Sequence, residues 1–411
     1  MTAPTYIGID RMLRPGTFAL TALLAALSAV GPLTTDMYLP SLPDIVRLLG
    51  ATTAEGQFTI SAYLVGFAVG QVVYGPLSDR HGRKPVLIGA IALYCFASLL
   101  CALSTSIHML IAARALQAFG GCGGIVLARA VVRDLYSGPR AGRELSLIGS
   151  VMALAPVLAP IGGGILQTAF GWRSVFFTLV LAGLSGMATI WLLLPETLAL
   201  RAAEPVSFGS MLKSYRVVAR DAAYLAYSGL ATTSYAGLFA WISASSFVLQ
   251  NIYGLAPLNF ALVFAIGSLG YMVGATLAAR LVVPLGIDGT IGIGSVAMAL
   301  GGIAMMGSVA LGLTSSLSLV LPMALYLAGL GFVLPQSIAG AMTPFPERAG
   351  AASALLGFIQ QAVAALCGVA VGQLLAHTAW PLAIAVAFMG SASLLLWLGT
   401  VAVRARVQHN D

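Results

Sequence analysis

Long apolar segments separated by short polar or Gly/Pro-rich connections dominate the sequence. Each of twelve segments holds the roughly 20 apolar residues that a helix needs to cross a bilayer core of about 30 Å. They cover residues 17–38, 57–77, 84–104, 108–128, 144–167, 173–194, 222–249, 258–282, 289–311, 316–336, 350–374 and 379–402. Backbone groups in lipid must be paired internally, and the short alternating segments of a barrel do not occur. We therefore predict an all-α membrane protein with twelve transmembrane helices.

The composition excludes the common soluble classes. Charged residues make up 8% of the chain and hydrophobic residues 59%, whereas soluble proteins carry about 25% charged residues. Such an apolar chain cannot be intrinsically disordered. A disulfide scaffold is also excluded, because the four cysteines all lie inside apolar segments. They are Cys95, Cys101, Cys122 and Cys367.

The distribution of Lys and Arg predicts the orientation. If the N-terminus is cytoplasmic, 17 of the 20 basic residues fall on the cytoplasmic side. They are Arg11, Arg14, Arg80, Arg83, Lys84, Arg129, Arg133, Arg140, Arg143, Arg201, Lys213, Arg216, Arg220, Arg280, Arg348, Arg404 and Arg406. Arg47 and Arg173 lie outside, and Arg114 lies within a span. This bias predicts an inner-membrane protein with both termini cytoplasmic. The net charge of +7 then reflects orientation, and no soluble basic domain suggests nucleic-acid binding.

A cleaved signal peptide over residues 1–30 is an alternative interpretation of the N-terminus. Arg11 and Arg14 would form its basic region, and the small residues around Ser28 could suit a peptidase. Eleven spans would leave the charge bias intact. Cleavage would, however, discard a helix whose far end carries Asp36, so we favour the uncleaved chain.

The longest hydrophilic interruption divides the apolar segments six and six. It runs from Pro195 to Asp221 and predicts a cytoplasmic linker, 195–221, between a half formed by 1–194 and a half formed by 222–411. Arg280 and Gly286 follow the eighth segment much as Arg80 and Gly82 follow the second, a faint sign of an internal repeat.

The second and third segments are joined by a charged turn with the sequence GPLSDRHGRKP, residues 75–85. Gly82 supplies backbone freedom between two helices, and its basic residues favour the cytoplasmic surface. Asp79 is placed to meet a cation or a helix N-terminus. A solvated loop that only sets the topology is the alternative.

This turn resembles the cytoplasmic loop signature of the major facilitator superfamily. Three further stretches narrow the resemblance to its Bcr/CflA branch of proton-driven drug exporters. They are DMYLPSLP at 36–43, RALQ at 114–117 with RDLY at 133–136, and GWR at 171–173. The sequence departs from the family pattern at Ala118 and Ala159, where glycine is usual, but both replacements are small.

The resemblance implies roles for particular residues. Asp36 resembles the first-helix acid that couples protons to substrate, and Arg114 resembles the fourth-helix arginine of the central cavity. Gly75, Arg80 and Gly82 belong to the loop motif. Asp79, Arg83 and Asp134 resemble an inner charge network that closes the cytoplasmic side of the outward-facing state. The hinge-like element of the fifth helix corresponds to Pro156, Pro160, Gly163 and Gly164.

Asp36 and Arg114 are the ionisable residues that fall well inside the predicted spans. Charges in the membrane are costly and usually functional. Arg114 is six residues into its helix, about 9 Å deep at 1.5 Å per residue, so an ion pair with Asp36 is feasible. Burial favours the neutral acid, whereas a nearby arginine favours the carboxylate. A carboxyl balanced between them could carry protons, and a permanent pair that only orders the helices is the alternative.

A broad apolar cavity with few polar groups would suit amphipathic drugs. Candidate lining residues are Tyr63, Tyr235, Trp241, Tyr326, Gln336, Gln360 and Gln361, and helix packing or an interfacial aromatic belt is the alternative for each. The four histidines lack metal-ligand spacing. The chain also lacks a Gly-rich phosphate loop. We therefore expect no metal, no cofactor and no enzymatic activity.

The sequence thus predicts proton-coupled efflux of amphipathic drugs and antibiotics by alternating access. Its expected partners are small amphipathic molecules, protons and membrane lipid, with the chain acting as a monomer. A transporter of the same architecture for one specific metabolite is the alternative function. A membrane enzyme or a non-transporting receptor is a more remote one.

Overall fold

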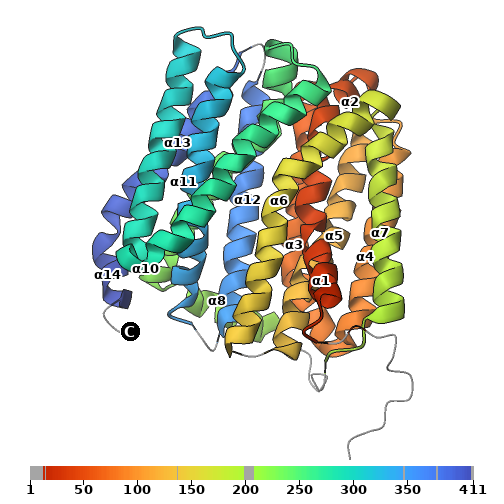
Figure 1. Ribbon diagram of the computed structural model, residues 1–411, viewed down its shortest axis with the longest axis vertical. Helices are drawn as coiled ribbons and strands as arrows, with labels where there is room; N and C mark the ends of the chain where they lie inside the picture. The colour runs from red at the N-terminus through yellow and green to blue at the C-terminus, as the bar shows by residue number, and fades with distance from the viewer. Residues whose placement is uncertain are drawn as a thin grey trace, which may run out of the picture.

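The computed structural model is a bundle of long helices (Figure 1). It describes residues 13, 15–136, 138–198, 208–345, 348–375 and 378–408, and within these ranges it contains no strand. The predicted positions Arg11, Arg14 and Arg201 lie outside the described residues. The all-α membrane fold predicted from the apolar segments is therefore confirmed.

The first group of helices runs from α1 to α7. The elements are α1 (Phe18–Asp36), the 3-10 turn η2 (Leu39–Ser41), α2 (Leu42–Leu48), α3 (Thr53–His81), α4 (Arg83–Ala102), α5 (Ile107–Leu135), α6 (Gly138–Phe170) and α7 (Arg173–Leu193). Local sequence signals fix several starts. Thr17 and Ser106 cap α1 and α5, and a capping box of Thr52 and Glu55 begins α3.

The second group begins after residue 207. Its elements are α8 (Phe208–Val218), α9 (Ala222–Phe247), the π-helical turn η3 (Val248–Ile252), α10 (Pro257–Ala310), α11 (Leu317–Met342), α12 (Ala349–Leu374), α13 (Trp380–Gly399) and α14 (Val401–Gln408). The carboxylate of Asp221 accepts from the backbone N–H of Tyr224 and caps α9. The segment predicted as a linker, 195–221, therefore contains the short helix α8 in its described part.

Ten helical stretches of the described chain are long and apolar enough to cross a membrane. One is α10, whose 54 residues correspond to about 81 Å of straight helix, more than twice the thickness of a bilayer core. It contains the predicted spans 258–282 and 289–311, and the backbone leaves helical geometry between them at Gly286, where φ is 70°. α10 is thus long enough for two crossings joined by a tight turn.

The helix α9 is long enough to span a membrane, but it is not apolar enough to be one of these ten stretches. It carries many serines and threonines, and most of its 26 residues are buried in protein. A helix surrounded by other helices can carry hydroxyl groups that lipid would not tolerate. The total of twelve spans stays a prediction, and α9 together with the two parts of α10 would complete it.

We name the two ends of the bundle by their landmarks. The α2 end is the end that carries the short helix α2, and the Gly82 end is the end that carries the turn between α3 and α4. The start of α1 lies at the same end as α8 and α14 (Figure 1). The first and second groups of helices meet along two seams, where α3 packs on α12 and α6 packs on α10.

Candidate functional site

Asp36 is the last residue of α1, where the chain turns into η2. Its residue surface is only 4% exposed. Among the described residues it has neither an ion pair nor a hydrogen-bond partner for its side chain. A buried carboxylate without a partner is strongly disfavoured, so this environment favours the neutral acid.

Arg114 on α5 is completely buried. Its guanidinium carbon lies 4.6 Å from the ring centroid of Tyr38 and 4.4 Å from that of Tyr63. The Nη1 atom donates to Gln117 Oε1 at 2.7 Å and to the carbonyl of Thr34 at 3.4 Å. The Nε and Nη2 atoms have no hydrogen-bond partner. Two aromatic faces therefore compensate the buried charge in place of a carboxylate.

Asp36 and Arg114 do not form an ion pair in the structure, although their predicted depths made one feasible. The expectation of similar depth is met, because Arg114 reaches the backbone of Thr34, two residues before Asp36. Successive helical residues are rotated by about 100°, so residues two apart point to different sides of a helix. Arg114 thus reaches α1 through the backbone carbonyl of Thr34 and not through the Asp36 carboxyl.

Hydroxyl and amide groups around Arg114 form a buried network that the sequence did not reveal. Gln117 Nε2 donates to Ser98 Oγ at 2.8 Å. Thr34 and Tyr94 are joined by a hydrogen bond of 2.7 Å between their hydroxyl oxygens. Ser98 and Tyr94 lie one turn apart on α4, and no motif marks them. Tyr38 could have been noticed, since it stands two residues after Asp36 in the quoted stretch.

The predicted fifth-helix element lies within α6, which contains both Pro156 and Pro160. At Gly163 an added Cβ would lie 2.8 Å from the carbonyl carbon of Met37, the residue after Asp36. At Gly164 it would lie 3.0 Å from the Cβ of Ala261 on α10. These two glycines let α6 approach both the end of α1 and the opposite group of helices.

The candidate cavity residues fall into two sets. Tyr63 stacks on Arg114, and its hydroxyl donates to the Gly31 carbonyl at 3.2 Å. In the second group of helices, Gln361 Nε2 on α12 donates to the hydroxyl of Tyr235 on α9 at 3.3 Å. The remaining candidates are Gln360, which donates to the Ala231 carbonyl, Gln336, which is half-buried, and the fully buried Trp241 and Tyr326.

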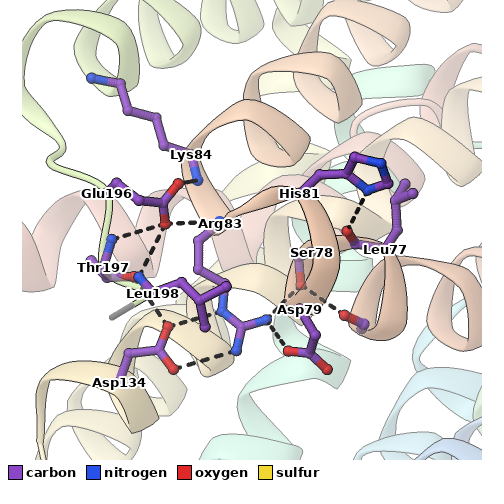
Figure 2. Close-up of polar contacts among 11 residues, drawn as sticks. Leu77, Ser78, Asp79, His81, Arg83, Lys84, Asp134, Glu196, Thr197 and Leu198 are labelled. Atoms are coloured by element: carbon purple, nitrogen blue, oxygen red, sulfur yellow. Dashed lines mark hydrogen bonds and ion pairs between the residues drawn. The ribbon is translucent and has the colours of Figure 1, made fainter. Parts of the chain in front are cut away.

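A second cluster lies at the Gly82 end and is centred on Arg83 (Figure 2). Its Nη1 atom lies 2.5 Å from Asp79 Oδ1, and its Nε atom lies 2.9 Å from Asp134 Oδ2. The same Nη1 donates to Ser78 Oγ at 2.7 Å. The structure thus brings together the three residues of the predicted inner charge network, and joins α3, α4 and α5 through one guanidinium.

Glu196 completes this cluster, although it belongs to none of the motifs in the sequence. Its carboxylate accepts from the backbone N–H groups of Arg83 and Lys84 at 2.9 and 3.2 Å, at the N-terminus of α4 (Figure 2). A helix N-terminus favours an anion because its first N–H groups are unpaired. Gly82, with φ of 100°, makes the preceding turn possible. In the sequence, this contact is indicated by an acidic residue shortly after the sixth apolar segment.

The other loop-motif residues lie outside the cluster. Arg80 is exposed and has no ion pair with a described residue, and an added Cβ at Gly75 would meet no neighbour within 4 Å. Within the described residues, no group of three or more His, Cys, Asp or Glu side chains could hold a metal ion.

Replacing Arg83 by Gln should destabilise the Gly82 end, because the ion pairs to Asp79 and Asp134 would be lost and both carboxylates would lose their shared cation. We expect the free energy of unfolding to fall by about 1–3 kcal/mol, since the cluster is only partly buried. Thermal unfolding of the purified protein measures this. Arg80→Gln removes a neighbouring exposed charge and should change stability little, so equal effects of the two substitutions would contradict the assignment.

Comparison with known proteins agrees with this architecture. The sequence profile of the Major Facilitator Superfamily matches residues 24–368. The chain is 37% identical to the Uncharacterized MFS-type transporter YdgK of Bacillus subtilis, over 83% of this chain and 85% of that protein. It is 30% identical to the Bicyclomycin resistance protein homolog of Haemophilus influenzae, over 89% and 92% of the two chains.

A crystal structure of peptide transporter POT in complex with sulfate superimposes with a TM-score of 0.74 over 97% of both chains at 15% identity, which shows the same fold. The profile match over most of the chain and these relatives together show which family the protein belongs to. The chain belongs to the Major Facilitator Superfamily of transporters, with the expected resemblance to its Bcr/CflA branch.

Proposed function

We propose that this transporter exports small amphipathic drugs in exchange for protons, with Asp36 as the proton carrier. The observation that carries the proposal is the position of Asp36, a carboxyl buried at the end of α1 without a partner among the described residues. Similarity to a protein named for bicyclomycin resistance supports drugs as the substrate class.

The proposed cycle depends on the fact that Asp36 can change its protonation state, whereas Arg114 cannot. Arginine keeps its proton, so Arg114 remains a fixed charge between the two tyrosine rings. Asp36 can gain or lose a proton when its access to water changes sides. In the state with the α2 end sealed, Asp36 is neutral. Drug entering from the Gly82 end then favours the state with Asp36 ionised, and the proton leaves on that side.

The orientation in this proposal follows the distribution of basic residues. The Gly82 end faces the cytoplasm and the protein lies in the inner membrane, with both termini inside. The proton gradient supplies the work, and the chain acts as a monomer without a cofactor. Two groups of helices, divided at the linker 195–221, rock about the buried site along the seams of α3 with α12 and of α6 with α10.

Proton release on drug binding tests the proposal directly. Purified protein in a weakly buffered detergent solution is mixed with ethidium, an amphipathic cation, and the pH change is recorded. We expect release of up to about one proton per chain, because drug binding and Asp36 protonation are thermodynamically linked. The Asp36→Asn variant should release none. Equal release from both proteins would refute Asp36 as the carrier.

A further inference from the structure

The residues that follow Asp36 connect it to the opposite group of helices. Ser246 on α9 donates its hydroxyl to the carbonyl of Leu39 at 2.5 Å. Gln250 in η3, about one turn later, donates its amide to the carbonyl of Pro40 at 3.2 Å and to Ser246 Oγ at 2.9 Å. Leu39 and Pro40 stand three and four residues after the buried carboxyl. We call Ser246 and Gln250 the latch.

The sequence explains why the carbonyl of Leu39 can accept this hydrogen bond. In a continuing helix, its partner would be the backbone N–H four residues later, at Pro43, but proline has no N–H group. The chain there forms the 3-10 turn η2, in which Leu42 N donates to the same carbonyl. Its second lone pair remains for Ser246, a fully buried residue.

The same segment is tied to the site on its other side. The Tyr38 hydroxyl is hydrogen-bonded to Thr59 at 2.8 Å, and its ring covers Arg114. Residues 38–40 therefore contact the buried cation within their own group of helices and α9 in the other group. A change at Asp36 that moves this short segment must move the contact between the groups.

Near the latch, the interface between the two groups of helices contains buried polar atoms without a hydrogen-bond partner. Gln57 on α3 is fully buried, and neither its Nε2 nor its Oε1 has a hydrogen-bond partner. Ser243 on α9 and Ser41 in η2 likewise have unpaired, buried hydroxyls. Such atoms are rare because their desolvation is costly. An interface that opens to water in part of a cycle would hydrate them, and a permanently closed one would not.

We propose that Ser246 and Gln250 are positioning residues that hold the α2 end closed through the backbone of Leu39 and Pro40, and thereby link the state of Asp36 to opening at that end. The link to transport rests on the proposed function. The latch itself does not, because opening at the α2 end can be measured without substrate or gradient.

Thiol labelling measures this opening. Ser41→Cys places a reporter in η2 and removes no hydrogen bond, because the Ser41 hydroxyl makes none. The purified protein in detergent is treated with a maleimide, and the unsubstituted parent, whose four cysteines are buried, gives the background. Adding Ser246→Ala or Gln250→Ala should raise the labelling rate about two- to tenfold, the range expected when one hydrogen bond between the two groups of helices is lost.

The matched control is Ser234→Ala on the same helix. Ser234 is also fully buried, but its hydroxyl donates only to Ala231 in its own helix. Its replacement should leave the labelling rate unchanged, and Ser246→Thr, which retains the hydroxyl, should behave more like the parent than Ser246→Ala. Equal rates for Ser246→Ala and Ser234→Ala would overturn the latch.

A second measurement covers the case in which Ser246→Ala fails to fold. Spin labels at the exposed positions Arg47 on α2 and Asn251 in η3 report the distance across the α2 end. With Gln250→Ala, the distribution should gain a longer component, and an unchanged distribution would refute the latch. If the latch is confirmed but proton release is independent of Asp36, the proposed function fails while the latch stands.

Discussion

Replacing Asp36 by Asn should abolish proton-driven export while leaving the protein folded. Asn has nearly the shape of the neutral acid that the buried site favours, so packing at the end of α1 should be retained. It cannot release a proton, and Arg114 cannot take over because it remains charged. In sealed proteoliposomes with an imposed proton gradient, we expect ethidium transport to fall to the level of empty vesicles.

Asp44→Asn provides the control for this experiment. Asp44 lies on α2, its side chain is 34% exposed, and one of its oxygens pairs with the exposed Arg47 at 2.7 Å. The other oxygen accepts from Gln167 Nε2 at 2.6 Å, and the amide oxygen of Asn can still accept this hydrogen bond. Surface ion pairs such as the one with Arg47 contribute little, so this variant should transport like the parent. Gradient-driven transport by Asp36→Asn at the parental rate would refute the coupling role, and loss in both variants would point to damage at the α2 end.

The positions of the helices could be predicted because the bilayer imposes a length on every apolar segment. The segment 84–104 corresponds to α4 (Arg83–Ala102), and 173–194 corresponds to α7 (Arg173–Leu193). Hydropathy alone could not show that α3 and α5 extend further, to His81 and Leu135. Those extensions carry polar residues such as Asp79 and Asp134, which form ion pairs with Arg83.

The site was less predictable because it depends on side-chain direction. Sequence positions gave the depths of Asp36 and Arg114, and Arg114 does reach α1. Which side of α1 it meets depends on how the helices are rotated, and no pattern in this sequence fixes that. The same holds for Glu196, whose contact with the N-terminus of α4 joins residues 112 positions apart or more.

Gly163→Ala should reduce transport about five- to 100-fold, because its methyl group would collide with the backbone of Met37 next to Asp36. A backbone neighbour cannot rotate away as a side chain can, so α6 or the end of α1 must shift. Overpacking of this kind costs about 1–3 kcal/mol, and about 1.4 kcal/mol corresponds to a tenfold change in rate. Transport in proteoliposomes and thermal unfolding should both report the change.

Gly162→Ala separates this collision from a general effect of alanine on α6. Gly162 is in the same helical turn, but an added Cβ there would meet nothing within 4 Å. Alanine also favours helix over glycine by about 1 kcal/mol, so this variant should be as stable as the parent or more stable. If the two variants transport equally well, close approach at Gly163 is not needed. A defect confined to Gly163→Ala would show that α6 must touch the segment after Asp36 for the cycle to run.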